Sequence, residues 1–219
     1  MFELPLFPLH TVLFPGMPLE LHIFEPRYRL MVQRCLESDQ PFGVVLIRQG
    51  PEAGGPLAQT HAIGCSARIA QADPLPEERY SLVVVGDERF RIHKLDRSQP
   101  YLIGKVESLM LEHPCGIELS RGARQLNQLI HRYIQRLETL ADEAGHLKDI
   151  PLPDDALPLM YLAAALLHIP NSEKQPLLDA GNGGDLMHRL LRLYQRENAL
   201  LTRQPDWDEE RHRLMAWLN

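Results

Sequence analysis

The side chains that could perform chemistry in this chain are plentiful but scattered. Ten histidines are present, and none of them forms an HExxH motif or pairs with a cysteine at the spacing of zinc ligands. The cysteines Cys35, Cys65 and Cys115 lie too far apart for a CxxC motif, and their odd number disfavours a secreted disulfide framework. We therefore predict no metal site, and reduced thiols in a cytoplasmic protein.

Carboxylate pairs and glycine-rich segments also lack the surroundings that catalysis needs. The pairs Asp87-Glu88 and Asp154-Asp155 fall at expected turns and helix starts, where the helix dipole favours negative charge. The sequence contains neither a GxSxG nucleophile elbow nor a GxxxxGKS or GxxxxGKT phosphate-binding loop. A glycine-rich run, Gly181–Gly184, precedes a helix, but Asp185 follows it and no strand comes before it, which disfavours anion binding. We predict no catalytic residue and no cofactor.

Net charge and hydropathy disfavour nucleic acid and membranes as partners. A net charge of -6 and a pI near 5.9 make nucleic acid an unlikely ligand, since phosphate backbones bind clustered cations. Arg89 and Arg91 form a short basic pair on an expected strand face that we expect to be solvated. The first residues do not resemble a signal peptide, and no apolar run approaches the roughly 20 residues that span a bilayer. We therefore predict a soluble protein that does not bind membranes.

Elements that position these side chains can be recognised from hydrophobic periodicity. A proline-rich turn, Phe14–Pro18, precedes an expected strand in which apolar and polar residues alternate from Leu19 to Phe24. Pro26 suits the first turn of a helix, and apolar residues recur at offsets of 3, 4, 7 and 8 from Tyr28. That spacing predicts one buried stripe along the helix.

The strand pattern continues from Phe42 to Leu111. Phe42–Ile47 is a short apolar run, and Leu82–Val85 is rich in β-branched residues, as in a central strand. Gly86 interrupts the alternation and predicts a bulge or sharp bend. Five or six strands with such bends fit a small closed or half-closed barrel better than a flat sheet.

The hydrophobic period changes to that of helices near residues 112–118. Leu119–Leu140 has the spacing of one long amphipathic helix, and Met160–Leu167 is apolar all round, which predicts a helix at the centre of a bundle. Ser172 and Gln175 match a capping box for a short helix, and a last leucine-rich helix follows.

This organisation predicts three regions. Residues 1–115 form a β-rich, barrel-like lobe, residues 116–204 an α-helical lobe, and residues 205–219 a helical tail. The tail contains both tryptophans, and we expect its apolar face to dock on the body of the protein, with docking on a partner as the alternative. That face comprises Trp207, Leu214, Met215, Trp217 and Leu218.

Several segments together resemble one protein family. LPLFPLHTVLFPGMPLELHIFEPRYRLM, which begins at Leu4, resembles the opening of the amino-terminal domain of the Lon ATP-dependent proteases. IGCSARI, LVVVGDERFRI and the run from LPLMYLAAALLHIP to LLRLYQRE extend the resemblance over about residues 3 to 202. The resemblance implies an α+β fold with a barrel-like, PUA-like β lobe followed by an α-helical bundle lobe.

What the resemblance implies about function is a binding role without catalysis. We expect a standalone substrate-binding domain, without the ATPase and protease domains of a full Lon chain, that binds proteins or unfolded polypeptide segments. A link to proteolysis or protein quality control would follow. The alternative is a small-molecule or nucleic-acid binder that uses the PUA-like β lobe, and a hydrolase ranks below both.

The expected polypeptide-binding site lies at the first strand and helix of this family segment. Phe14 and Met17 lie in the proline-rich turn, and Phe24 points away from the apolar strand face, so these residues could expose an apolar patch. Arg27 and Tyr28 would supply hydrogen bonds at its edge. The alternative is that the turn and Phe24 fold back onto the first helix or onto the second lobe.

Overall fold

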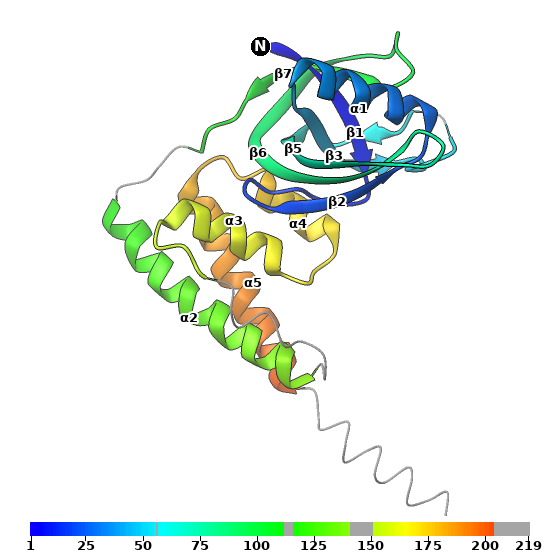
Figure 1. The fold of residues 1–219 in the computed structure, drawn as a ribbon. Coiled ribbons are helices and arrows are strands. Elements are labelled where there is room, and N and C mark those ends of the chain that lie inside the picture. The colour runs from blue at the N-terminus through cyan, green and yellow to red at the C-terminus, as the bar shows by residue number, and fades with distance from the viewer. Residues whose placement is uncertain (56, 112–115, 141–150, 204–219) are drawn as a thin grey trace, which may run out of the picture.

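The fold comprises a β lobe and a helical lobe that follow one another along the chain (Figure 1). It is a computed structural model that describes residues 1–55, 57–111, 116–140 and 151–203. The tail predicted at 205–219 lies outside the described residues. The strands are β1 (Phe2–Leu9), β2 (Pro18–Ile23), β3 (Phe42–Gln49), β4 (Gln59–Thr60), β5 (Ile63–Leu75), β6 (Arg79–Asp96) and β7 (Leu102–Ser108). The helices are α1 (Pro26–Ser38), α2 (Gly116–Leu140), α3 (Ala156–Leu166), α4 (Asn171–Leu178) and α5 (Gly183–Arg203).

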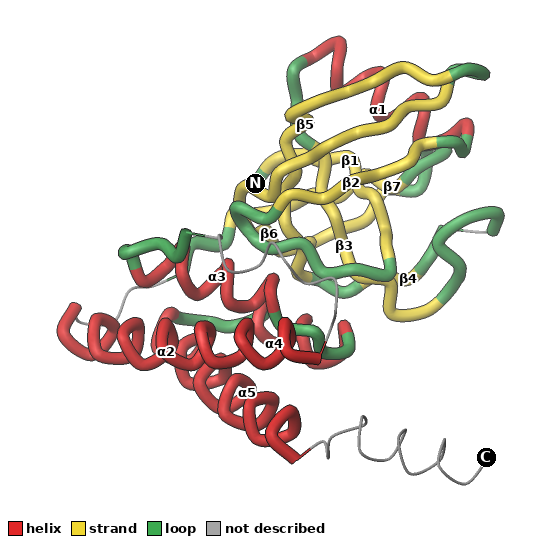
Figure 2. The backbone as a smooth tube through the Cα atoms, turned by 60° about the horizontal axis from the view of Figure 1, so that its bottom comes forward, coloured by secondary structure: helices red, strands yellow, loops and turns green. Residues whose placement is uncertain are grey.

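The β lobe closes into a barrel, which Figure 2 shows from another side. The strand order β1-β7-β6-β5-β3 returns to its start because β1 and β3 also pair, in parallel, with Phe7 opposite Val44. Closure removes the exposed edges that an open sheet would leave. The predicted α+β fold, a barrel-like β lobe followed by helices, is confirmed.

Strand β6 is long enough to belong to two parts of the sheet. Its first half pairs with β2, and its second half pairs with β7, while β5 runs along both halves. The register with β5 shifts between Cys65 and Ala67, opposite the segment that begins at Gly86. This irregularity confirms the bend predicted at Gly86. The buried stripe of α1 belongs to one apolar cluster with residues of β1, β2, β3, β5 and β6, although Leu36, assigned to that stripe from its spacing, is 41% exposed.

The helical lobe is built around an apolar cluster that also includes residues of the β lobe, with α3 and α4 next to the barrel and α2 alongside α5 farther away (Figures 1 and 2). Met160, Ala163 and Ala164 of α3 are buried, as expected for a central helix. The predicted capping box of α4 is wrong. Pro170 is the N-cap, and the Gln175 amide donates to the Ile63 carbonyl of β5 and to Asp179 instead. The local pattern assigned the Gln175 side chain to the cap of α4, but that side chain forms a hydrogen bond with the β lobe instead.

Candidate functional site

An apolar groove of about 520 Å³ lies where the β lobe meets the helical lobe. One wall is the turn that precedes β2, and the other is formed by α3 and the segment that leads into it. None of the described residues that line it carries a charge. Its lining consists of Pro15, Gly16, Met17, Pro18, Pro153, Pro158, Tyr161, Leu162, Ala165 and Leu166. Such a surface offers apolar contact and few hydrogen-bond donors, because proline has no backbone N–H.

Backbone hydrogen bonds hold the first wall in place. Gly16 adopts a φ of 77°, in the left-handed region that glycine enters without a steric penalty. Its N–H donates to the Gly86 carbonyl at 2.8 Å, and the Gly86 N–H donates to the Met17 carbonyl at 2.9 Å. A β-carbon at position 86 would lie 2.2 Å from the Phe14 carbonyl oxygen. The turn and the bend in β6 therefore fit together only because both positions are glycine.

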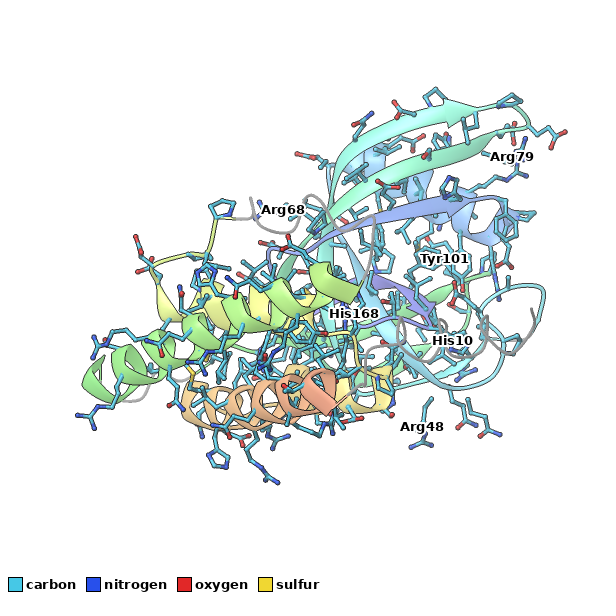
Figure 3. The ribbon with its side chains drawn as sticks, turned by 90° about the horizontal axis from the view of Figure 1, so that it is seen from below. His10, Arg48, Arg68, Arg79, Tyr101 and His168 are labelled. Carbon is cyan, nitrogen blue, oxygen red and sulfur yellow. The ribbon has the colours of Figure 1, made fainter. Side chains whose placement is uncertain are left out.

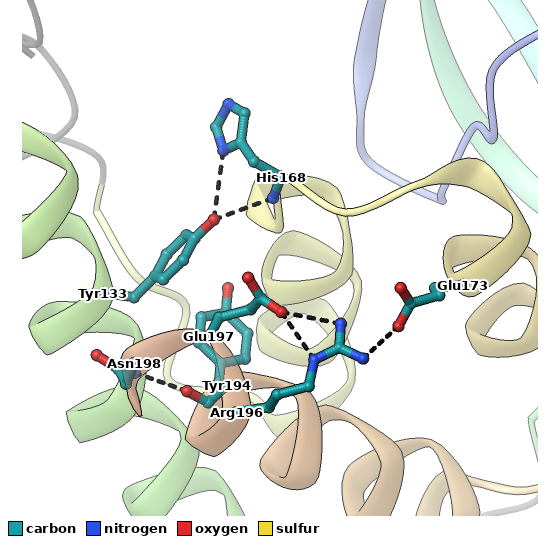
Figure 4. Close-up of polar contacts among 7 residues, drawn as sticks. All are labelled: Tyr133, His168, Glu173, Tyr194, Arg196, Glu197 and Asn198. Atoms are coloured by element: carbon teal, nitrogen blue, oxygen red, sulfur yellow. Dashed lines mark hydrogen bonds and ion pairs between the residues drawn. The ribbon is translucent and has the colours of Figure 1, made fainter. Parts of the chain in front are cut away.

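The second wall is fixed by polar contacts inside the helical lobe, some of which Figure 4 shows. The Tyr133 hydroxyl of α2 accepts a hydrogen bond from the His168 backbone N–H, just beyond α3, at 3.0 Å. The Tyr194 hydroxyl of α5 donates to the Ala163 carbonyl at 2.9 Å. Asn198 in turn donates to the carbonyls of Tyr194 and Leu129. These bonds hold α3 against α2 and α5, so the groove wall is supported from behind.

Tyr161 connects the groove to a buried cation. Its side chain lines the groove, and its phenol lies beside the guanidinium of Arg89. Burial raises the pKa of the Tyr161 phenol, and the positive charge of Arg89 opposes that rise. The tyrosine therefore stays neutral at physiological pH, and the groove remains uncharged.

Arg89 joins the two lobes, contrary to the solvated position predicted for it. Only 3% of the residue is exposed, and its guanidinium donates to the carbonyls of Leu178 at 2.7 Å and Ala180 at 2.8 Å. Those carbonyls belong to the last residue of α4 and the turn after it, where helix carbonyls lack partners within the helix. Arg91, two residues along β6, is exposed as expected.

Phe14 is buried, which corrects the expectation that it forms part of an exposed patch. It is 0% exposed and belongs to the apolar cluster of the helical lobe, together with Val12 and Leu46 from the β lobe. The turn therefore folds back onto the second lobe, as in the alternative left open by the sequence, but Phe24, which that alternative also folds back, is 57% exposed. Of the residues predicted in this turn, Met17 remains half-buried and lines the groove.

The other predicted binding residues lie at the far end of β2. Phe24 is 57% exposed. Arg27 does not offer its hydrogen bonds to a ligand, because it pairs with Glu25 at 2.9 Å and donates to the carbonyls of Glu52 and Gly55 in the loop after β3. Tyr28, by contrast, is 4% exposed, and burial raises the pKa of its phenol to about 12. Met17 and this group are separated by the length of β2, roughly 16 Å at the usual rise per residue, so the five residues do not form one site.

Other side chains offer little reactive chemistry in the described part of the chain. Within those residues no three or more histidines, cysteines or carboxylates come together as metal ligands. Burial raises the pKa of Cys35 to about 11 and that of Cys65 to about 12, so both thiols are protonated and poor nucleophiles. Of the helices that the structure describes, none combines the length and the apolar character required to cross a bilayer.

Cations on the surface are dispersed or neutralised. Figure 3 shows Arg48, Arg68 and Arg79 well apart from one another. Three arginines of α5 line a hollow of about 770 Å³ beside α4. Two of them, Arg189 and Arg196, pair with Asp185 and Glu173 in the same hollow. This hollow is therefore less basic than its arginines alone would make it.

The sequence is similar to proteins of one family over most of its length. The family model described as the ATP-dependent protease La (LON) substrate-binding domain matches residues 3–196. Lon protease 2 of Myxococcus xanthus is 29% identical over 210 residues, covering 90% of this chain and 24% of that protein. The Lon protease of Syntrophus aciditrophicus (strain SB) is 31% identical over 182 residues, covering 80% and 23%. The chain therefore spans about a quarter of the length of these curated relatives.

Two solved structures have the same fold. A Lon N-terminal domain protein from Xanthomonas campestris superposes with a TM-score of 0.62 and 26% sequence identity, over 88% of this chain and 98% of that one. The N-terminal domain of a Mycobacterium avium complex Lon protease superposes with a TM-score of 0.65 over 89% and 98%. At 17% identity, the second similarity concerns the fold alone.

Proposed function

Since the chain belongs to the family of Lon substrate-binding domains, we propose that its interlobe groove binds apolar segments of extended polypeptides. The observation that carries this proposal is the lining of the groove, whose described residues are uncharged and predominantly apolar. An apolar groove with few polar groups is the usual form of a site that recognises side chains rather than charge. Met17 is the residue of the predicted site that takes part.

The binding that such a groove supports is weak. Its volume of about 520 Å³ accommodates only a few side chains. Fully burying one large apolar side chain contributes about 1.5–3 kcal/mol, and association and ordering of the segment offset much of that gain. We expect dissociation constants on the order of micromolar to millimolar. Weak binding suits the handling of many unrelated segments, because affinity then depends on apolar content and not on one sequence.

The role that we propose for these residues is binding without catalysis. The family match is to the substrate-binding domain and not to an ATPase or protease domain. Cys35 and Cys65 are buried with raised pKa values and therefore do not supply a nucleophile. A connection to proteolysis, through a Lon protease or another partner, forms part of the proposal, as does a cytoplasmic location.

The proposal is tested with a fluorescein-labelled peptide that has a central Leu-Phe-Leu run and Gly-Ser flanks. We expect saturable binding by fluorescence anisotropy, and at least a fivefold weaker affinity for the double variant Met17→Ser, Leu162→Ser, because both residues line the groove. Phe24→Ser and Leu36→Ser remove exposed apolar side chains elsewhere and should bind like the parent. Loss of binding in Phe24→Ser, with the groove variant unaffected, would move the site to the start of α1.

A further inference from the structure

Beside the apolar groove lies a polar hollow that carries two carboxylates. A second hollow, of about 530 Å³, shares Pro153 with the groove and extends along the start of α3. Asp154 and Asp155 line it, together with Arg124 of α2 and several uncharged residues. A segment bound in the groove that extends past Pro153 therefore meets this charged hollow.

Both carboxylates are available to a ligand. Asp155 occupies the N-cap position of α3, yet its side chain makes no capping hydrogen bond. Among the described residues, neither carboxylate forms a hydrogen bond or ion pair, and both residues are exposed. Among the described residues that line the hollow, Arg124 supplies one positive charge against two negative ones, so the net charge of this described lining is negative.

We infer that the groove prefers apolar segments that carry lysine or arginine on the flank next to Pro153. This inference rests on the proposed function and adds the charge of the substrate to it. The apolar run fills the uncharged groove, and the basic side chain reaches the Asp154 and Asp155 carboxylates. An acidic flank would instead be repelled there. Ion pairs at exposed positions are individually weak, so we expect the two carboxylates together to give a preference of about threefold to tenfold.

Paired peptides test the preference. Each contains the same Leu-Phe-Leu run, followed or preceded by Lys-Lys, Glu-Glu or Ser-Ser, so that both chain directions are sampled. We expect the best Lys-Lys peptide to bind about threefold to tenfold more tightly than its Glu-Glu counterpart at low salt, with a smaller ratio in 0.5 M NaCl because salt screens exposed charges.

Variants locate the origin of the preference. Asp154→Asn with Asp155→Asn keeps residues that suit a helix start and should bring the Lys-Lys to Glu-Glu ratio close to one. Arg124→Gln should increase it. Glu77→Gln with Glu78→Gln changes the net charge of the protein equally, at a hairpin remote from the groove in the sequence, and should leave most of the ratio unchanged.

The outcomes separate the inference from the proposed function. If the Ser-Ser peptide binds and the charged peptides bind equally, the function stands and the charge preference is wrong. The same conclusion follows if the Glu77 and Glu78 variant abolishes the preference as completely as the Asp154 and Asp155 variant. If none of the peptides binds, the proposed function itself fails. Concentration-dependent dimerisation that the groove variant abolishes would assign the groove to a second copy of the chain and overturn both.

Discussion

Arg89 shows how one buried cation joins two lobes without a carboxylate partner among the described residues. Its guanidinium donates to two backbone carbonyls at the end of α4 and lies beside the Tyr161 phenol. Carbonyls at a helix end lack partners inside the helix and carry partial negative charge. The cation therefore replaces water at a helix terminus that the β lobe covers. The same side chain supports Tyr161, so the stability of the interface and the shape of the groove depend on one residue.

We predict that Arg89→Met lowers the free energy of unfolding by about 2–4 kcal/mol, because two buried carbonyls lose their donor. Methionine keeps an unbranched apolar stem and removes the guanidinium with its charge. Arg91→Met, at an exposed position on the same strand, should change stability by less than about 0.5 kcal/mol. Urea denaturation followed by circular dichroism measures both. If Arg89→Met and Arg91→Met changed the free energy of unfolding equally, the interlobe contacts of Arg89 would not contribute to stability.

Among the elements, the hairpin between β5 and β6 contains local strain. Glu77 and Glu78 have φ values of 63° and 56°, in the left-handed region that disfavours most side chains. The Arg29 guanidinium donates to the Glu77 carbonyl at 2.6 Å and pairs with the Glu78 carboxylate at 3.2 Å. Contacts from Arg29 of α1 thus help to hold the hairpin tip in a backbone conformation that Glu77 and Glu78 do not favour. The tip exposes its carboxylates and takes no part in the groove.

Glu77→Gly should stabilise the protein by about 0.5–1 kcal/mol, since glycine adopts a positive φ without a steric penalty. The substitution keeps the backbone carbonyl that Arg29 contacts and removes only an exposed carboxylate. Glu77→Ala removes the same carboxylate without that conformational freedom, so it should bring no gain. Thermal or urea denaturation measures the stability of the glycine and alanine variants. A gain in stability in the alanine variant would assign the effect to the lost charge and not to the backbone φ.

At the scale of the whole molecule, the two lobes share part of one core. Val12, Phe14 and Leu46 of the β lobe pack within the apolar cluster of the helical lobe. Gln175 and Arg89 add polar contacts in opposite directions across the same interface. Because its walls come from both lobes, the groove exists only when they are docked. Ligand binding should therefore stabilise the docked arrangement.

For this reason we predict that both lobes unfold in one transition and that Phe14→Ala lowers the free energy of unfolding by about 3–5 kcal/mol, the cost of removing a buried aromatic side chain. Phe24→Ala removes the same kind of side chain from an exposed position and should cost little. Far-UV circular dichroism reports the helices, and near-UV circular dichroism reports the packing of aromatic side chains in both lobes. Separate transitions in the two signals would indicate that the lobes are independent.

The resemblance of several segments indicated the family, and periodicity in the sequence was sufficient to predict the barrel-like lobe, the bulge or bend at Gly86 and the helices. The reason is that each of these depends on local spacing: a period of two for strands, a period near 3.6 for helices, and glycine where backbone geometry requires it. Met17 was also assigned to the turn that forms one wall of the groove, because prolines and a glycine mark that turn.

Only the tertiary structure decided which side chains the lobes conceal. The local sequence predicted Phe14 and Arg89 at the surface and Gln175 in a helix cap. All three residues are buried at the junction of the lobes. Tyr161 and Leu162 belong to the helix that the sequence predicted at the centre of a bundle, and both line the groove. A contact between positions far apart in the chain leaves no local period. The groove arises from such contacts, between a turn near residue 16 and a helix near residue 162, so its existence depended on how the two lobes dock.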